Sequence, residues 1–145
     1  GCMSNWPIST KIPVLWGDMD SFGHVNNIIY LKWCETSRVD LFCDVWNLDA
    51  LSMKKILDEE GIGPILANFN INYRIPVVSP DIICVQTRIK KIGNTSFGIE
   101  HQLTSKNNGD KVVADADSIV VMVNYKTGEK VQIDSKNRKK LEVFS

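Results

Sequence analysis

The sequence has no hydrophobic run long enough to cross a membrane. No stretch approaches the roughly 18–20 consecutive apolar residues that a span needs, and no signal-peptide pattern opens the chain. Net charge is missing as well, because 17 basic residues balance 17 acidic ones. The densest basic run, residues 135–140, contains no aromatic residue and is expected to be a solvated tail. We therefore expect no membrane span and no nucleic-acid partner.

Paired cysteine motifs are also absent. The four cysteines form no CxxC pair, and Cys34 and Cys43 lie about 13 Å apart along one predicted helix, too far for a disulfide. Reduced thiols and a cytoplasmic location are therefore expected. We expect the whole chain, 1–145, to form one domain, with the first two residues a short remnant before the native start at Met3.

Several familiar catalytic motifs are missing. The sequence contains no G-x-S-x-G elbow, no HExxH, no P-loop and no GxGxxG. His24 with Asp18 and Asp20 would make a thin metal-ligand set, because it offers one imidazole and two loop carboxylates. We therefore expect neither a metal nor a cofactor.

The spacing of apolar residues divides the chain into one strand, two helices and four further strands. In residues 27–46 they recur every three or four positions, as in an amphipathic helix, and Asn26 or Asn27 can cap its start. A shorter helix is expected over 49–60, ending at Gly61. Alternation predicts strands at 10–17, 64–76, 82–92, 96–105 and 112–125. We expect an α+β fold, with a five-stranded antiparallel sheet wrapped around the long helix.

A polar segment, GDMDSFGHVNN at 17–27, stands directly before the long helix. The first N–H groups of a helix have no partner within it, and with the helix dipole they can hold a negatively charged oxygen. A carboxylate from this segment could lie beside them and promote acyl transfer to water, either by attack or by activating the water. The alternative is ordinary capping, in which Asp18 and Asp20 fix a turn and Asn26 caps the helix.

Two blocks of the sequence resemble a known family. The stretch VLWGDMDSFGHVNNIIYLKWCETSR at 14–38 is similar to the signature of hotdog-fold acyl-CoA thioesterases of the 4-hydroxybenzoyl-CoA thioesterase-like family. Its HVNN form also resembles acyl-acyl-carrier-protein thioesterases, and ANFNINYRIPVVSPD at 67–81 resembles the strand after the long helix in that family. The resemblance implies a hotdog fold, which agrees with the order of elements predicted above.

The resemblance also implies roles for individual residues. Asp20, the second aspartate of the D-x-D pair, matches the catalytic carboxylate, and the backbone N–H of Asn27 matches the oxyanion donor. Gly23 would keep the loop tight, and Asp18 would be a structural partner.

Further residues are candidates for substrate binding. His24 and Asn26 could orient the loop or touch the substrate, and Tyr30 with Trp33 could line an acyl pocket, although such a helix face is usually core. Contact with CoA phosphates could come from Lys90 and Lys91. The other histidine, His101, is expected to lie in the core or an interface.

The expected function is hydrolysis of acyl thioesters, fatty or aryl, carried on CoA or on acyl carrier protein. A hotdog hydratase is the alternative enzyme, but its D-x-N-P-x-H pattern fails here because His24 lies four residues after Asp20 and six after Asp18. A non-catalytic acyl-binding hotdog is the alternative outside enzymes. Open strand edges and a site at a loop predict a homodimer or homotetramer, and the resemblance implies that both subunits build each site.

Overall fold

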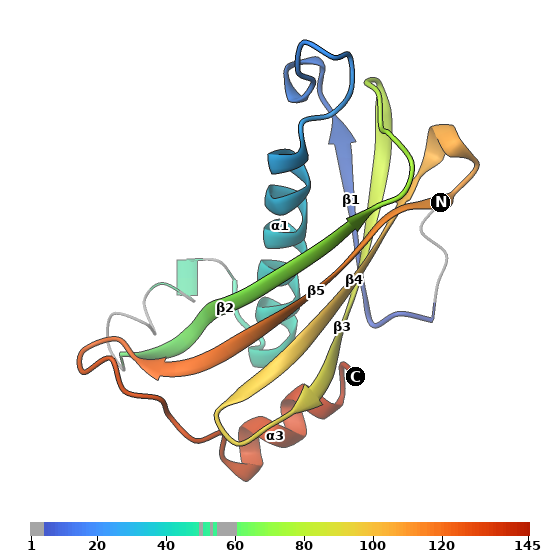
Figure 1. The fold of residues 1–145 in the computed structure, drawn as a ribbon. Helices are drawn as coiled ribbons and strands as arrows, with labels where there is room; N and C mark the ends of the chain where they lie inside the picture. Colours follow the sequence, from blue (N-terminus) through green and yellow to red (C-terminus); the bar gives the residue numbers. More distant parts are fainter. Residues whose placement is uncertain (1–4, 50, 53, 55–60) are drawn as a thin grey trace.

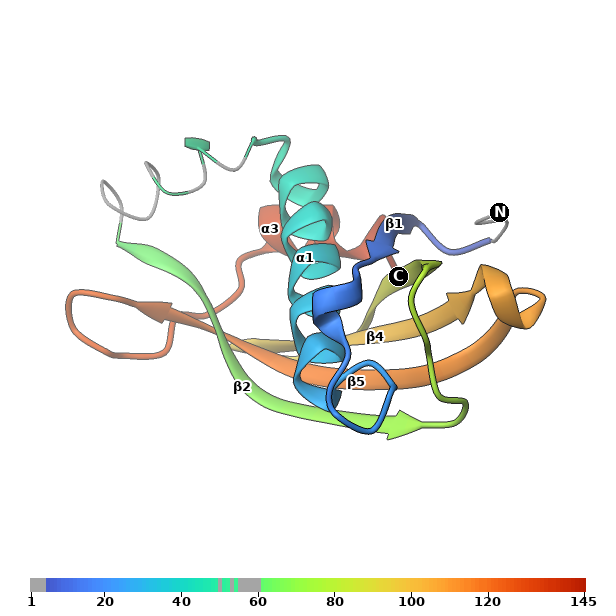
Figure 2. The same ribbon diagram turned by 90° about the horizontal axis from the view of Figure 1, so that it is seen from above.

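Five strands form one antiparallel sheet that curves around a long helix (Figures 1 and 2). The computed structural model describes residues 5–49, 51, 52, 54 and 61–145. The strand order is β1-β3-β4-β5-β2. The elements are β1 (Ile8–Val14), a 3-10 turn η1 (Trp16–Asp18), α1 (Asn27–Trp46), β2 (Ile62–Tyr73), β3 (Asp81–Ile92), β4 (Ser96–Ser105), a 3-10 turn η2 (Lys106–Asn108), β5 (Lys111–Asn124) and α3 (Ser135–Glu142).

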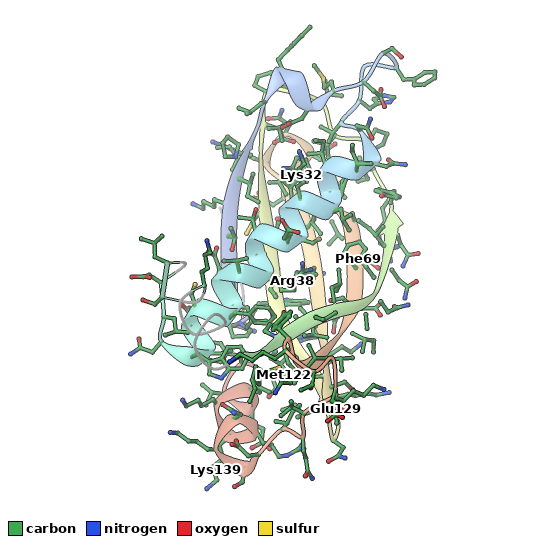
Figure 3. The ribbon with its side chains drawn as sticks, turned by 90° about the vertical axis from the view of Figure 1, so that its left-hand side faces the viewer. Lys32, Arg38, Phe69, Met122, Glu129 and Lys139 are labelled. Atoms are coloured by element: carbon green, nitrogen blue, oxygen red, sulfur yellow. The ribbon has the colours of Figure 1, made fainter. Side chains whose placement is uncertain are left out.

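The long helix α1 has the predicted bounds. Asn26 caps it in an extended conformation, and its side chain accepts the N–H of Ile28. The helix ends at Asn47, which adopts the left-handed conformation. In Figure 3, α1 crosses in front of the sheet, with the labelled Arg38 at its middle and Phe69 of the edge strand β2 at its side.

The core lies between α1 and the concave face of the sheet. Strand β4 shows the alternation most clearly, because every second residue from Phe97 to Ser105 is buried. The first half of α1 packs through Tyr30, Trp33 and Cys34. The second half packs through Leu41, Phe42 and Val45.

The second predicted helix, 49–60, falls mostly on residues outside the described ones. Its described positions, Leu51, Ser52 and Lys54, are helical. The carboxylate of Asp49 accepts the N–H of Ser52 at 2.7 Å, as an N-cap does. Gly61 follows with φ +72°, a conformation that glycine adopts without strain.

The basic run near the C-terminus is not the solvated tail that was expected. It forms helix α3, whose first turn is capped by the carboxylate of Asp134. Leu141 is 1% exposed, and the indole N–H of Trp46 donates to Asn137 at 3.0 Å. The charges of the run are solvated, but two apolar residues around it, Ile133 and Leu141, bury themselves and order the segment.

The cysteines correct one expectation. The thiols of Cys34 and Cys43 are free, but Cys84 is disulfide-bonded, so not all cysteines are reduced. Cys2 lies outside the described residues. Within the described part of the chain, no helix has the length and apolar character that a membrane crossing requires.

Candidate active site

The polar segment between β1 and α1 forms a loop that is closed by its own backbone. The N–H of Asn26 donates to the carbonyl of Asp18 at 2.9 Å, and the N–H of Asp20 donates to the carbonyl of His24 at 2.9 Å. At the tip, Gly23 has φ +80°, which explains why the sequence places a glycine there. The loop and the start of α1 therefore form one fixed unit.

The two aspartates of the D-x-D pair hold different parts of this loop. Oδ2 of Asp18 accepts the N–H of Leu15 at 2.9 Å, which closes the 3-10 turn η1. Oδ1 of Asp20 accepts the N–H of Phe22 at 2.9 Å, which makes an Asx turn at the loop tip. Both carboxylates therefore fix a turn, as the alternative of ordinary capping predicted. Within the described residues, Oδ2 of Asp20 has no hydrogen-bond partner, so it is available for chemistry.

The helix start offers a free N–H group. The side chain of Asn26 accepts the N–H of Ile28 at 3.1 Å, and its carbonyl accepts the N–H of Ile29 at 2.9 Å. The N–H of Asn27 finds no acceptor in the part of the chain that the structure describes. This donor can therefore hold a substrate oxygen, whereas the amide of Asn26 is occupied as the cap.

An open groove of about 260 Å³ runs between the helix start and the end of β2. His24, Asn27 and Tyr30 border it on the helix side, and Tyr73 and Arg74 border it on the strand side. In the single chain the carboxylate of Asp20 does not line this groove. Asp20 lies on the same loop as His24, which does line the groove, and the two residues share a backbone hydrogen bond.

Aromatic contacts fix the groove wall. The ring of Tyr30 lies 5.0 Å from the ring of Tyr73 and 5.0 Å from that of Trp33, both edge to face. The hydroxyl of Tyr73 donates to the carbonyl of Asn27 at 3.2 Å, so the edge strand holds the first turn of α1. Burial, followed by the neighbouring Tyr73, raises the pKa of Tyr30 to about 12, although a hydrogen bond from the Val77 backbone opposes the rise. Tyr30 is thus a neutral wall rather than an acid.

Comparison with known proteins identifies the family. Residues 14–141 match the model of the thioesterase-like superfamily. The chain belongs to this superfamily. It is 30% identical over 135 residues to the long-chain acyl-CoA thioesterase FadM of Escherichia coli K12, covering 93% of this chain and 97% of that protein.

Solved structures agree with the family assignment. The crystal structure of the probable thioesterase YbaW from Escherichia coli is 28% identical and has a TM-score of 0.77, with 94% of this chain and 98% of that chain covered. A 4-hydroxybenzoyl-CoA thioesterase variant in complex with 4-hydroxybenzoyl-CoA shares the fold, with a TM-score of 0.82 at 19% identity over 92% and 97% of the two chains. This chain is therefore a thioester hydrolase with a hotdog fold.

The site residues predicted from the sequence do not all lie together in this thioesterase. Asp20, Gly23, His24, Asn26 and Asn27 gather at the loop and the helix start. Trp33 is 4% exposed and belongs to the core, and of the two predicted wall aromatics only Tyr30 reaches the groove.

The two predicted phosphate-binding lysines lie elsewhere. Strands β1 and β3 pair so that Val14, next to the loop, lies opposite Asp81 of β3. Lys90 is nine residues after Asp81, which places it roughly 30 Å along β3 from the loop. Lys90 and Lys91 border a separate hollow of about 410 Å³. Nζ of Lys90 lies 3.5 Å from Glu100. One chain of the thioesterase therefore does not bring these lysines to Asp20.

Two groove residues, Tyr73 and Arg74, were not found from the sequence. Both belong to the resemblance block 67–81, but nothing local marks them, because their position depends on β2 running past the helix start. Among the described residues, no group of three or more His, Cys, Asp or Glu side chains could hold a metal ion.

Proposed function

We propose that this thioesterase hydrolyses acyl-CoA thioesters with Asp20 as the reacting carboxylate and the Asn27 N–H as the oxyanion donor. The main support for this proposal is the free N–H of Asn27, which lies at the groove. The closed loop that leads into this residue also carries Oδ2 of Asp20. The similar protein FadM is named for long-chain acyl-CoA. The groove is walled by Tyr30 and Tyr73, which suits an apolar or aromatic acyl group.

The proposed reaction adds oxygen to the thioester carbon and breaks the carbon–sulfur bond. The carbonyl oxygen gains negative charge as the tetrahedral intermediate forms, and the Asn27 N–H stabilises it. In one route Asp20 attacks the carbon, the thiolate leaves, and water then hydrolyses the mixed anhydride to give the free acid and restore the carboxylate. In the other route Asp20 removes a proton from the attacking water, and that proton finally leaves with the thiol. Single-turnover hydrolysis in oxygen-18 water tests for direct attack, because label in Asp20 arises only when water cleaves the anhydride at the aspartyl carbon. No metal or cofactor takes part in this scheme.

Two copies of the chain are proposed to build each site. Strand β2 is twelve residues long, and in the described structure it pairs only with β5, so its other edge is open. Ile65 and Leu66 on this strand are 42% and 38% exposed. The other edge strand, β1, is shorter and carries Lys11 and Pro13, which discourage pairing.

A symmetric pair through β2 would also supply what one chain lacks. Two identical edges related by a two-fold axis run antiparallel, so the loop end of one copy lies beside the α3 end of the other. Lys90 and Lys91 of the second copy would then approach the first copy's site, where they could contact CoA phosphates. His24 is proposed to touch the substrate from the groove wall, and the protein is proposed to be cytoplasmic.

Thiol release from a panel of fatty and aryl acyl-CoAs and acyl-acyl-carrier-proteins tests the function. We expect thiol release from acyl-CoA that is lost in Asp20→Asn. A change in enoyl absorbance without thiol would instead indicate a hydratase. Binding without either signal would indicate a non-catalytic acyl-binding protein, and both results would overturn the proposal.

A further inference from the structure

Arg74 lies at the rim of the groove, and only one nitrogen of its guanidinium is paired. Tyr73 is the last residue of β2 and Arg74 follows it directly. The hydroxyl of Tyr73 reaches the helix start, whereas Nε of Arg74 forms an ion pair with Asp115 of β5. The Arg74 side chain is 57% exposed and still lines the groove.

The position of this guanidinium is fixed from two sides. The backbone N–H groups of Arg74 and Ile75 both donate to the carbonyl of Val113, at 2.8 and 3.1 Å. The carboxylate that holds Nε is itself held, because Asn72 donates to Oδ1 of Asp115 at 3.1 Å. A long side chain tethered in this way loses less conformational entropy when it binds a ligand.

The two terminal nitrogens of Arg74 are free to bind a ligand. Its Nε is used by Asp115, and within the described residues neither Nη atom has a hydrogen-bond partner. Two parallel N–H groups match two oxygens of a phosphate, a fit that lysine does not reproduce. Of the described residues that line this groove, Arg74 is also the one with a permanent positive charge.

We propose that Arg74 binds a phosphate ester on the thiol carrier of the substrate. The inference rests on the proposed function, which places the thioester carbonyl at the Asn27 N–H. The side chain of Tyr73 bonds to the helix start, whereas that of Arg74 is held at Asp115, so we assign the acyl carbonyl to the Asn27 N–H and not to the guanidinium. The carrier arm that leaves the sulfur and runs out of the groove brings its phosphate to the rim. CoA and the phosphopantetheine of a carrier protein share this chemistry.

The test compares substrates that differ only in phosphate. Arg74→Met is assayed with one acyl group on CoA, on carrier protein, on phosphopantetheine and on pantetheine without phosphate. We expect KM to rise about tenfold or more with the phosphorylated carriers, with kcat little changed, and no rise with acyl-pantetheine. Arg74→Lys should recover part of the loss on the phosphorylated carriers.

The pattern of loss also identifies the source of the phosphate. A loss confined to acyl-CoA assigns the contact to the nucleotide phosphates, whereas an equal loss on acyl-phosphopantetheine assigns it to the phosphate that carrier proteins share. Lys11→Met is the control, because Lys11 is an exposed cation on β1, at the opposite edge of the sheet from β2. It should leave all four substrates unaffected.

Three results would overturn the proposal. They are equal losses on all four substrates, no loss on any of them, or the same selective loss in Lys11→Met. Thermal melting of each variant identifies misfolding. Asp115→Asn removes the carboxylate that holds the guanidinium but keeps the charge of Arg74, so it should give a smaller selective rise in KM. These failures leave hydrolysis by the wild-type protein intact, whereas absence of thiol release from the wild type would refute the proposed function itself.

Discussion

Oγ1 of Thr87 lies 2.7 Å from Nδ1 of His101, and neither side chain is exposed to solvent. Ser37 of α1 bonds to Thr87 in turn, and Thr10 of β1 reaches Asp40 at 2.7 Å. These side chains form a polar contact between the helix and the sheet inside an apolar core. The expectation that His101 is a core residue is confirmed.

The protonation state of His101 should make the protein sensitive to acid. Burial, and then the positive charge of Arg38, lower the pKa of His101 to about 3. In the unfolded chain a histidine titrates near 6.5. The stabilisation is therefore complete above about pH 6.5 and is lost as the pH falls towards 3, by up to ~1.4 kcal/mol per pH unit. Urea unfolding at several pH values between 7.5 and 4 measures the slope.

The control for this prediction is His101→Gln, which removes the titrating group. Its free energy of unfolding should be lower at neutral pH but should fall less steeply with acid than that of the wild type. Parallel slopes in the two proteins would show that other groups cause the acid sensitivity.

Asp20→Asn should abolish most of the activity without unfolding the protein. The amide oxygen can still accept the N–H of Phe22, so the Asx turn is kept while the basic and nucleophilic oxygen is lost. We expect kcat to drop roughly 10²–10⁴-fold. Asp18→Asn is the matched control and should act mainly on the melting temperature, since Asp18 closes η1. A loss of less than about threefold in Asp20→Asn would remove the proposed role.

Asn27→Pro tests the oxyanion donor directly. Asn26 has φ −63° and ψ 139°, the extended conformation that a residue before proline prefers, and proline is well tolerated at the first helical position. The variant should fold but lose roughly 10²–10³-fold in kcat, because it lacks the N–H. Asn27→Ala keeps the N–H and should keep most of the activity. An active, folded Asn27→Pro would place the donor elsewhere.

Light scattering should report at least twice the chain mass of 16.3 kDa. Ile65→Lys puts a charge on the open edge of β2 and should give a monomer with little activity. Ile82→Lys is the control, since Ile82 is similarly exposed, at 40%, but lies on β3 inside the sheet. A fully active monomer would refute the shared site.

Local signals in the sequence predicted most of the fold. The bounds of α1 and β4 were found because three-to-four spacing and strict alternation continue without interruption from one end to the other. The cap at Asn26 was also visible, since it acts on its own neighbours. The C-terminal helix was missed because the charges of 135–140 hid the two apolar residues that anchor it.

The candidate site was only partly predictable for the same reason. Asp20, Gly23 and Asn27 are close in sequence, so their proximity in the loop could be anticipated. Arg74 reaches the groove through the pairing of distant strands, and the same strand geometry separates Lys90 from the loop. Neither relationship has a signature in a short stretch of sequence.

Substitution of the buried Leu141 measures how much the packing of α3 contributes to stability. Leu141→Ala removes a side chain that is 1% exposed and should lower the free energy of unfolding by about 2–5 kcal/mol. Val143→Ala, at a residue that is 74% exposed, should change it by less than about 0.5 kcal/mol. Similar effects of the two substitutions would mean that α3 is not part of the cooperative fold.

The hydrogen bond from Tyr73 to the carbonyl of Asn27 couples two segments that are 46 residues apart. When the end of β2 opens locally, the first turn of α1 loses that support at the same moment. Amide hydrogen exchange should therefore show similar protection at the two segments, rising and falling together as one cooperative unit. Tyr73→Phe would uncouple them, so that the helix start exchanges faster while the middle of β2 keeps its protection.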